Sequence, residues 1–379
     1  MKVLAFTPQY LPVVGGIEIF VDVLSQSLRR RSIETVVVTS CDRRKQLPER
    51  DVINGAVVYR LDFIRALQLG GAIGPLEVLH QLLRIVETEQ PDLLHMHSAL
   101  CSAPWYLERL LRKLTSGLPL IVTEHTLLQP SECLDVVRRL LLKADAVTGV
   151  SRSVLQSVIE LTGRTGQSVV IYNGVGERDP GTDVLARADR TTSRHRLICV
   201  GRLEREKGFD LAIAALAKVR STGFDAELTV IGDGEDRDFL LQAAMDHAIK
   251  NHVNFKGALD HASTLSAIAG SSLVLIPSRP REGFSLVAVE AARSGIPRVG
   301  TRVGGLEETI EDGVSGLLVA PDSADDLAAA VITLLSNDDR AREFSANARR
   351  ISREKFSLDT CVQAYLELYQ SVRKNGGSV

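Results

Sequence analysis

Residues 273–293 read LVLIPSRPREGFSLVAVEAAR, which is one complete βα unit. The apolar run at residues 273–276 indicates a short buried strand, and the proline after it ends that strand. A turn then presents Glu282 and Gly283, and the apolar spacing from Ser285 onward predicts a helix. In a parallel sheet the loop of such a unit lies at the carboxyl end of the strand, where ligands bind.

The same alternation of short strands and longer helices runs through the whole chain. In the first half it predicts strands over residues 2–6, 35–39, 93–96, 120–123, 146–150 and 168–172, and helices over 17–30, 76–89, 103–114, 132–142 and 151–161. In the second half it predicts strands over residues 196–200, 227–231, 253–255, 273–276, 297–300 and 317–319, and helices over 209–220, 236–250, 262–269, 285–293, 324–336, 339–355 and 360–372. Residues 173–192 interrupt the pattern with Gly, Pro and Asp. We therefore predict an α/β fold of two doubly wound, Rossmann-like domains with a cleft between them.

Composition narrows the classes of partner. The chain has 379 residues, a length that favours two domains. Its 45 Lys and Arg against 47 Asp and Glu give a net charge of −2, and aromatic residues make up 4%. A nucleic-acid groove needs a basic surface, and single strands need aromatic stacking platforms. We therefore expect no nucleic-acid partner.

Cysteine usage and hydropathy indicate the compartment. Five scattered cysteines without a C-x-x-C pair are typical of a reducing cytoplasm. The apolar N-terminus is interrupted at Thr7 and Pro8, too early for a signal peptide, and no apolar run reaches the length of a membrane span. We expect a cytoplasmic protein, and contact with the inner face of the membrane stays open.

Two loops carry features suited to phosphate. Gly15 and Gly16 follow the first strand and open a helix, where free backbone N–H groups favour an anion. Arg202 and Lys207 flank the turn after the first strand of the second half, where a guanidinium and an ammonium can hold a phosphate together. The alternative for each is an ordinary turn or a solvated charged loop. G-x-G-x-x-G is absent, which argues against a nicotinamide dehydrogenase.

Glu282 and Glu290 are eight positions apart, a rise of about 12 Å if the whole segment were helical. That exceeds the roughly 5 to 9.5 Å between the paired carboxyl groups of glycoside hydrolases. The two glutamates are better explained as two contacts along one extended ligand. Glu290 lies in an otherwise apolar helix, where a buried carboxylate needs a partner, whereas the simpler interpretation is a solvated glutamate.

At this level of detail the chain resembles the retaining glycosyltransferases of family 4, which have the GT-B architecture. The matching motifs of the second half are Gly201-Arg202 with Glu206-Lys207-Gly208, Ile231-Gly232-Asp233-Gly234, Pro277-Ser278 with Glu282-Gly283-Phe284 and Glu290-Ala291, and Gly304-Gly305 with Glu308. Weaker matches in the first half are Gly15-Gly16-Ile17-Glu18, His95-Met96-His97-Ser98 and Thr123-Glu124-His125. The resemblance implies an acceptor-binding domain over residues 1–178, joined by a C-terminal helix over 358–379, and a donor-binding domain over 179–357.

The resemblance also implies roles for single residues. Arg202 and Lys207 would bind the diphosphate of a UDP- or GDP-linked sugar in place of a metal, so that no cofactor and no metal site are expected. Glu282 would accept hydrogen bonds from the transferred sugar, and Glu290 from the ribose. The remaining implied contacts are the backbone of Gly283, Phe284, Ser285 and Leu286 with sugar or phosphate, Gly15 and Gly16 with the diphosphate, and His125 with the sugar near the reacting bond.

The reaction so implied is transfer with retention to a sugar, a lipid-linked or a small-molecule acceptor, with the departing phosphate taking the acceptor's proton. A nucleotide-sugar epimerase shares this architecture, and an antibiotic-type glycosyltransferase and a non-enzymatic sugar-nucleotide sensor are further alternatives. The donor base, the linkage and the oligomeric state are not encoded in these motifs.

Several features depart from the family pattern or allow two interpretations. Arg31-Ser32-Ile33 stands where the family commonly has a Gly-His pair, and Arg298 stands where an apolar residue is usual. We expect Arg298 to face solvent at a strand end. His95 and His97 fall on one face of a strand; we expect one to line the acceptor side and the other to be packed.

Two motifs imitate functional sites. Trp105 and Tyr106, followed by Arg109, Arg112 and Lys113, form a basic helix that either touches a membrane interface or covers the sheet, and we favour the second. Asp236-Arg237-Asp238 imitates a metal-binding D-x-D motif, but it falls at an expected helix start, where acidic residues complement the helix dipole.

Overall fold

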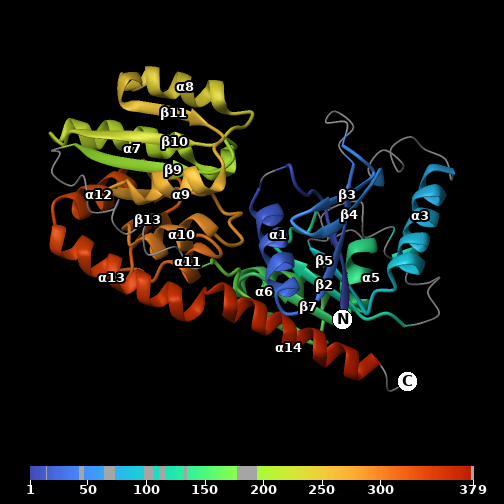
Figure 1. Ribbon diagram of the computed structural model, residues 1–379. Helices are drawn as coiled ribbons and strands as arrows, with labels where there is room; N and C mark the ends of the chain where they lie inside the picture. The colour runs from blue at the N-terminus through green and yellow to red at the C-terminus, as the bar shows by residue number, and fades with distance from the viewer. Residues whose placement is uncertain are drawn as a thin grey trace. The chain divides into compact units, whose positions relative to one another are not determined.

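The computed structural model describes residues 1–13, 15–41, 47–63, 73–97, 106, 108–110, 117–131, 135–176 and 194–376. The chain forms two compact units (Figure 1), of which unit 1 comprises Met1–Gly174 with Asp359–Val379 and unit 2 comprises Val175–Leu358. Most of the predicted interruption at residues 173–192 lies outside the described residues. Among the described helices, none combines the length and apolar character needed to cross a membrane.

Unit 1 is built on one sheet with the strand order β3-β4-β2-β1-β5-β6-β7-β8 among its described residues. Its strands are β1 (Lys2–Thr7), β2 (Glu34–Ser40), β3 (Arg50–Ile53), β4 (Ala56–Leu61), β5 (Leu93–His97), β6 (Leu120–Glu124), β7 (Ala146–Gly149) and β8 (Ser168–Val170). Its helices are α1 (Gly16–Arg29), α3 (Ile73–Glu89), α5 (Asp135–Lys143), α6 (Arg152–Thr162) and, from the C-terminus, α14 (Leu358–Gly376). All pairs are parallel except β3 with β4.

Unit 2 repeats this architecture with a six-stranded parallel sheet in the order β11-β10-β9-β12-β13-β14. Its strands are β9 (His195–Val200), β10 (Ala226–Ile231), β11 (Val253–Gly257), β12 (Leu273–Ile276), β13 (Arg298–Thr301) and β14 (Leu317–Val319). Its helices are α7 (Phe209–Ser221), α8 (Arg237–Asp246), α9 (His261–Ala269), α10 (Leu286–Ser294), α11 (Leu306–Thr309), α12 (Ala324–Leu335) and α13 (Asp338–Lys355), with short 3₁₀ turns at Arg205–Lys207 and Lys250–His252. Figure 1 shows β9, β10 and β11 side by side. The predicted fold class is confirmed.

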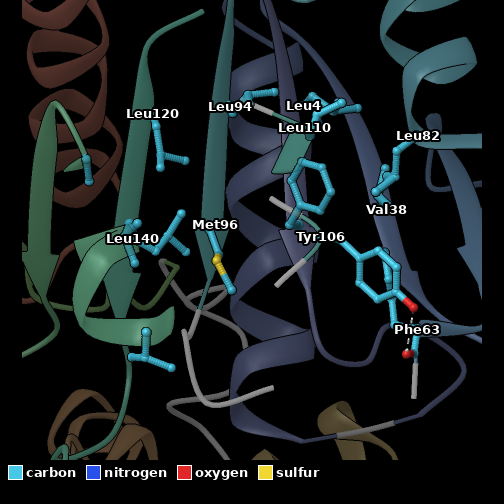
Figure 2. Close-up of a cluster of buried hydrophobic side chains, with 14 of the residues drawn as sticks. Leu4, Val38, Phe63, Leu82, Leu94, Met96, Tyr106, Leu110, Leu120 and Leu140 are labelled. Carbon is cyan, nitrogen blue, oxygen red and sulfur yellow. Dashed lines mark hydrogen bonds between the residues drawn. The ribbon is translucent and has the colours of Figure 1, made fainter. Parts of the chain in front are cut away.

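Successive side chains of a strand point to opposite faces of the sheet, and β5 shows this alternation. In β5, Leu94 and Met96 point into the apolar core of unit 1, which Figure 2 shows, and the intervening His95 and His97 belong to the opposite face. Tyr106 belongs to the same core and donates a hydrogen bond to the carbonyl oxygen of Phe63 at 3.3 Å. This buried Tyr106 agrees with a helix that covers the sheet; Trp105, Arg112 and Lys113 of the predicted basic helix lie outside the described residues.

The β3–β4 hairpin is absent from the sequence-based prediction. Ile53 pairs with Ala56 across a two-residue turn in which Asn54 and Gly55 have φ of 51° and 85°. An Asn-Gly pair between alternating apolar residues is a strong hairpin signal, because both turn positions require positive φ. The sequence of residues 53–56 therefore carries a local signal for this hairpin.

Arg298 corrects a second expectation. Its side chain is buried, with the residue 1% exposed, and does not face solvent. The guanidinium donates to the carbonyl oxygens of Ala288 (2.9 Å), Thr309 (3.1 Å) and Ser315 (2.6 Å). Burial lowers the pKa of this guanidinium to about 9. Arg298 therefore ties the backbone of α10 to that of α11 and the following turn.

Replacing Arg298 by alanine is expected to lower the free energy of unfolding by at least about 3 kcal/mol, because a cavity forms and buried carbonyl groups lose their donor. Hydrogen exchange at α10 peptides, together with urea unfolding followed by circular dichroism, measures the loss. The control is Arg302→Ala, whose half-exposed side chain pairs with Asp312 at 2.6 Å and should lower the stability far less, because exposed ion pairs contribute little. Equal, small effects of both variants would contradict the structural role of Arg298.

Candidate functional site

The predicted βα loop of unit 2 connects β12 to α10, where the sequence places the first glutamate. Ser285 caps α10, since its side chain accepts a hydrogen bond from the backbone N–H of Ala288 at 3.2 Å. The backbone N–H groups of the first turn, which begins at Leu286, have no acceptor within the helix. Glu282 is 9% exposed and lies just before this helix start. The loop thus combines a buried carboxylate with a helix N-terminus suited to an anion.

Lys207 and Glu282 are brought into direct contact. The Nζ atom of Lys207 lies 2.8 Å from Oε2 of Glu282, and the Ser278 hydroxyl donates to the same oxygen at 2.7 Å. The side chain of Lys207 keeps 28% of its surface exposed. Among the described residues, no donor contacts Oε1 of Glu282. The pair therefore leaves an exposed ammonium and one carboxylate oxygen for a ligand.

Close backbone contacts hold the loop of Lys207 and the loop of Glu282 near each other. Gly208 follows Lys207 with φ of 64°, and a Cβ atom there would lie 2.0 Å from the carbonyl oxygen of Pro277. The N–H of Gly305 donates to the carbonyl oxygen of Glu282 at 2.9 Å. A Cβ atom at Gly305 would lie 2.0 Å from the carbonyl oxygen of Gly283. These glycines allow three loops to pack around Glu282.

Arg279 reinforces the same contact. It donates to both carboxylate oxygens of Asp210 at 2.9 and 3.0 Å, to Asp322 at 2.7 Å, and to the carbonyl oxygen of Arg205 at 2.6 Å. Its hydrogen bonds to Asp210 raise the pKa of this guanidinium, which therefore stays charged. Bidentate pairs of this kind fix geometry as well as energy. Arg279 thus locks the Glu282 loop onto the Lys207 turn, a role that no local pattern revealed.

Arg202 is placed differently from Lys207. Its side chain is 66% exposed, and Nη1 pairs with Oε1 of Glu204 at 2.7 Å. An exposed pair of this kind contributes little to stability, so that the guanidinium can exchange partners. Phe284, also predicted as a site residue, is 8% exposed and packs edge-on against Phe356, with ring centroids 5.7 Å apart. Its side chain is thus structural, which leaves its backbone for ligand contact.

Glu290 lies on α10 among apolar neighbours and is 8% exposed. The partner that a buried carboxylate requires is His261, whose Nε2 lies 2.7 Å from Oε1 of Glu290. His261 is the first residue of α9 and was not among the predicted site residues. Its only sequence signal was a histidine at a helix start, which has no specific meaning by itself.

In unit 1, Gly15 is the N-cap of α1 and Gly16 is its first residue. Gly15 is extended, with φ of −155° and ψ of 178°, and has no side chain to occupy the first-turn N–H groups. The carboxylate of Glu18 lies beside Gly15 in the first turn of this fourteen-residue helix, so that an anionic ligand at the helix start would meet both the N–H groups and this carboxylate.

His125 belongs to a buried cluster in unit 1. Its Nε2 lies 3.2 Å from Nδ1 of His97, and the His97 ring lies 4.0 Å from that of His95. His95 in turn contacts the hydroxyls of Tyr369 and Thr123, each at 2.7 Å. All three histidines are buried, at 7% exposure for His125 and 1% for the other two. The structure gives both His95 and His97 buried, hydrogen-bonded positions, and the expectation that one of them lines the acceptor side stays a prediction.

In the part of the chain that the structure describes, no group of three or more His, Cys, Asp or Glu side chains is arranged to hold a metal ion, and this includes the Asp236-Arg237-Asp238 motif. Asp236 is the N-cap of α8 and Asp238 lies in its first turn, as the helix-start interpretation predicts. Cys199 and Cys361 are buried thiols whose pKa is raised by burial.

Both halves of the chain match family models of glycosyltransferases. A family model described as "Glycosyl transferases group 1" matches residues 186–351, and one described as "Glycosyltransferase Family 4" matches residues 14–177. The glycogen synthase of Mycobacterium tuberculosis is 33% identical over 233 residues, which are 61% of this chain and 55% of that protein. The chain thus spans about half the length of that relative.

Two further proteins are similar to this chain over most of their own length. The N-acetyl-alpha-D-glucosaminyl L-malate synthase of Bacillus anthracis is 29% identical over 310 residues, which cover 79% of this chain and 80% of that one. The structure of the Anabaena protein HepE in complex with UDP and glucose matches with a TM-score of 0.79 and 23% identity, covering 98% of this chain and all of that chain. The structural match identifies the fold as GT-B.

The histidine cluster predicts an acid-sensitive unit 1. Burial lowers the pKa of His95 and His125 to about 3, and that of His97 well below its ordinary 6.5. Below pH 6.5 the unfolded chain therefore binds more protons than the native one. The free energy of unfolding should fall as the pH drops from about 6.5 toward 3, by up to about 1.4 kcal/mol per pH unit for each histidine.

Urea unfolding between pH 4.5 and 7.5 measures this slope. His97→Asn should reduce it by about one third, because one of three buried imidazoles is removed. Replacement of the exposed His247 by Asn is the matched control and should keep the wild-type slope. An unchanged slope in His97→Asn would show that the histidines titrate equally in both states.

Proposed function

Because the chain belongs to the family 4-type glycosyltransferases with the GT-B fold, we propose that it transfers a sugar from a nucleotide-diphosphate sugar to an acceptor hydroxyl, with retention of configuration and without a metal ion. The observation that carries this proposal is the contact of 2.8 Å between Lys207 and Glu282 beside the start of α10. It puts a cation, a hydroxyl-binding carboxylate and free N–H groups at one place.

The diphosphate of the donor binds to the cations of unit 2. Lys207 offers a partly exposed ammonium, Arg202 an exposed guanidinium, and the first turn of α10 its N–H groups. Together they supply the positive charge that a divalent metal supplies in other transferases. The UDP bound in the structure of HepE, which shares the fold, supports a nucleotide ligand. Gly15 and Gly16, at the start of α1, stay predicted diphosphate contacts from unit 1.

Glu282 holds the transferred sugar. Its Oε2 already receives hydrogen bonds from Lys207 and Ser278, which orient the carboxylate, and Oε1 accepts from a sugar hydroxyl. A charged acceptor of this kind forms stronger hydrogen bonds than a neutral one. His125 stays a predicted sugar contact, and because burial lowers its pKa, it would act as a neutral hydrogen-bonding ring.

The chemical step needs no enzyme nucleophile. The acceptor oxygen attacks the anomeric carbon on the face from which the diphosphate leaves, so that one C–O bond forms as the C–O bond to phosphate breaks. The acceptor's proton passes to the departing phosphate oxygen. Negative charge grows on the diphosphate during this step, and preorganised cations and N–H dipoles stabilise it most where water is excluded.

The acceptor is a sugar, a lipid-linked sugar or a small molecule, and the transferred group is a hexose or an N-acetylhexosamine. The printed activities of the relatives, a glycogen synthase and an N-acetylglucosaminyl malate synthase, support this range and a role in polysaccharide, glycolipid or glycoside biosynthesis. Thermal-shift screening of UDP-, GDP- and ADP-sugars identifies the donor, because a ligand of the native state raises its stability.

Lys207→Ala and Arg202→Ala are each expected to lower kcat at saturating donor at least about 100-fold, by analogy with the loss of one oxyanion donor. Release of the nucleoside diphosphate with a panel of acceptors measures turnover, and circular dichroism checks the fold. Lys218→Ala is the matched control, since Lys218 pairs with Asp325 on α12, away from these loops, and should keep wild-type turnover. Near-normal turnover of Lys207→Ala would refute the assignment.

Chelation tests the second part of the proposal. After treatment with EDTA and removal of the chelate, the enzyme should keep its turnover within about twofold, because Lys207 and Arg202 supply the charge. The same assay as above measures it. A loss of activity that Mg²⁺ or Mn²⁺ restores would mean that the donor diphosphate needs a metal.

A further inference from the structure

His261 touches the proposed donor site but has no part in the reaction described above. Its Nε2 lies 2.7 Å from Oε1 of Glu290, and its side chain is 44% exposed. A carboxylate oxygen accepts hydrogen bonds, so Nε2 must carry the hydrogen. The contact therefore fixes one ring nitrogen as a donor and one carboxylate oxygen as its acceptor.

The surrounding helices hold this contact in place. The carboxylate of Asp260 caps α9 by accepting a hydrogen bond from the backbone N–H of Ser263 at 2.8 Å. His261, the first residue of α9, therefore follows directly after a capped helix start. Ile268 of α9 packs with Ala288 and Ala291 of α10 in one apolar cluster. The spacing of the two helices is thus set by buried side chains, and the distance between His261 and Glu290 follows from it.

Glu290 has two oxygens in different situations. Oε1 is occupied by His261, whereas no donor among the described residues contacts Oε2. Burial limits the water that can compensate this oxygen. A held carboxylate with one oxygen ready to accept is suited to a ligand that presents hydroxyl groups at a fixed position.

We propose that His261 is a specificity-determining residue for the ribose of the donor. By fixing Oε1, it orients the carboxylate so that Oε2 accepts from a ribose hydroxyl, and it thereby selects ribonucleotides over deoxyribonucleotides. This inference rests on the proposed function and on the contact between Glu290 and the ribose that the family resemblance implies. A site built to bind a hydroxyl discriminates strongly against an analogue without it, because its own buried polar group is left unpaired.

The test measures binding of UDP, GDP and ADP by calorimetry, and then of the 2′-deoxy and 3′-deoxy forms of the nucleotide that binds most tightly. His261→Ala should weaken binding of the ribonucleotide about threefold to tenfold, the range of one hydrogen bond, and should weaken binding of one deoxy form less than twofold. His261→Gln should restore part of the loss, since its amide can donate. The KM for the donor should rise while kcat at saturating donor stays near the wild-type value.

His247→Ala, at an exposed position on the same unit, is the matched control and should behave as wild type. If His261→Ala weakened the ribonucleotide and both deoxy forms equally, or weakened none of them, the assignment to the ribose would be wrong while the transferase proposal stood. If the wild-type chain bound none of the three nucleotides and transferred no sugar, the proposed function itself would fail, and this inference with it.

Discussion

The ion pair between Lys207 and Glu282 joins two loops that lie 75 positions apart in the sequence and adjacent in space. The loops follow β9 and β12, which are neighbours in the sheet of unit 2. Parallel strands end at the same edge, so the sheet brings these loops together before any side chain contributes. Gly208, Gly305 and Arg279 then set the separation by close backbone approach and by bidentate hydrogen bonds. The diphosphate and sugar contacts proposed for Lys207 and Glu282 depend on this spacing.

The sequence predicted those features that are encoded locally. The period of apolar residues placed both sheets, and the spacing from Glu282 to Glu290 pointed to an extended ligand because a helix converts eight positions into a length. Contacts between distant segments could not be found in this way. That His261 meets Glu290, and that Arg298 reaches three carbonyl groups, depends on the packing of whole helices. The Asn54-Gly55 hairpin is different, since its signal was local and was missed.

The two units use buried polar groups in opposite ways. In unit 2, Glu282 and Glu290 are charged acceptors, each matched with a donor from another loop or helix. In unit 1, burial lowers the pKa of His125 and of its neighbours, so that a neutral network extends to Tyr369 on α14. A neutral network can be buried fully, because it avoids the large cost of desolvating a charge. Helix α14, at the C-terminus, thus contributes buried side chains to unit 1, whose strands come from residues much earlier in the chain.

Arg298 gives unit 2 a particular response to heat. Its guanidinium is buried against carbonyl groups, no carboxylate among the described residues pairs with it, and burial lowers its pKa to about 9. Charged groups are hydrated less favourably as the temperature rises, so the cost of keeping this one out of water shrinks on warming. The link that Arg298 makes between α10 and α11 should therefore cost less to maintain at high temperature than at low temperature.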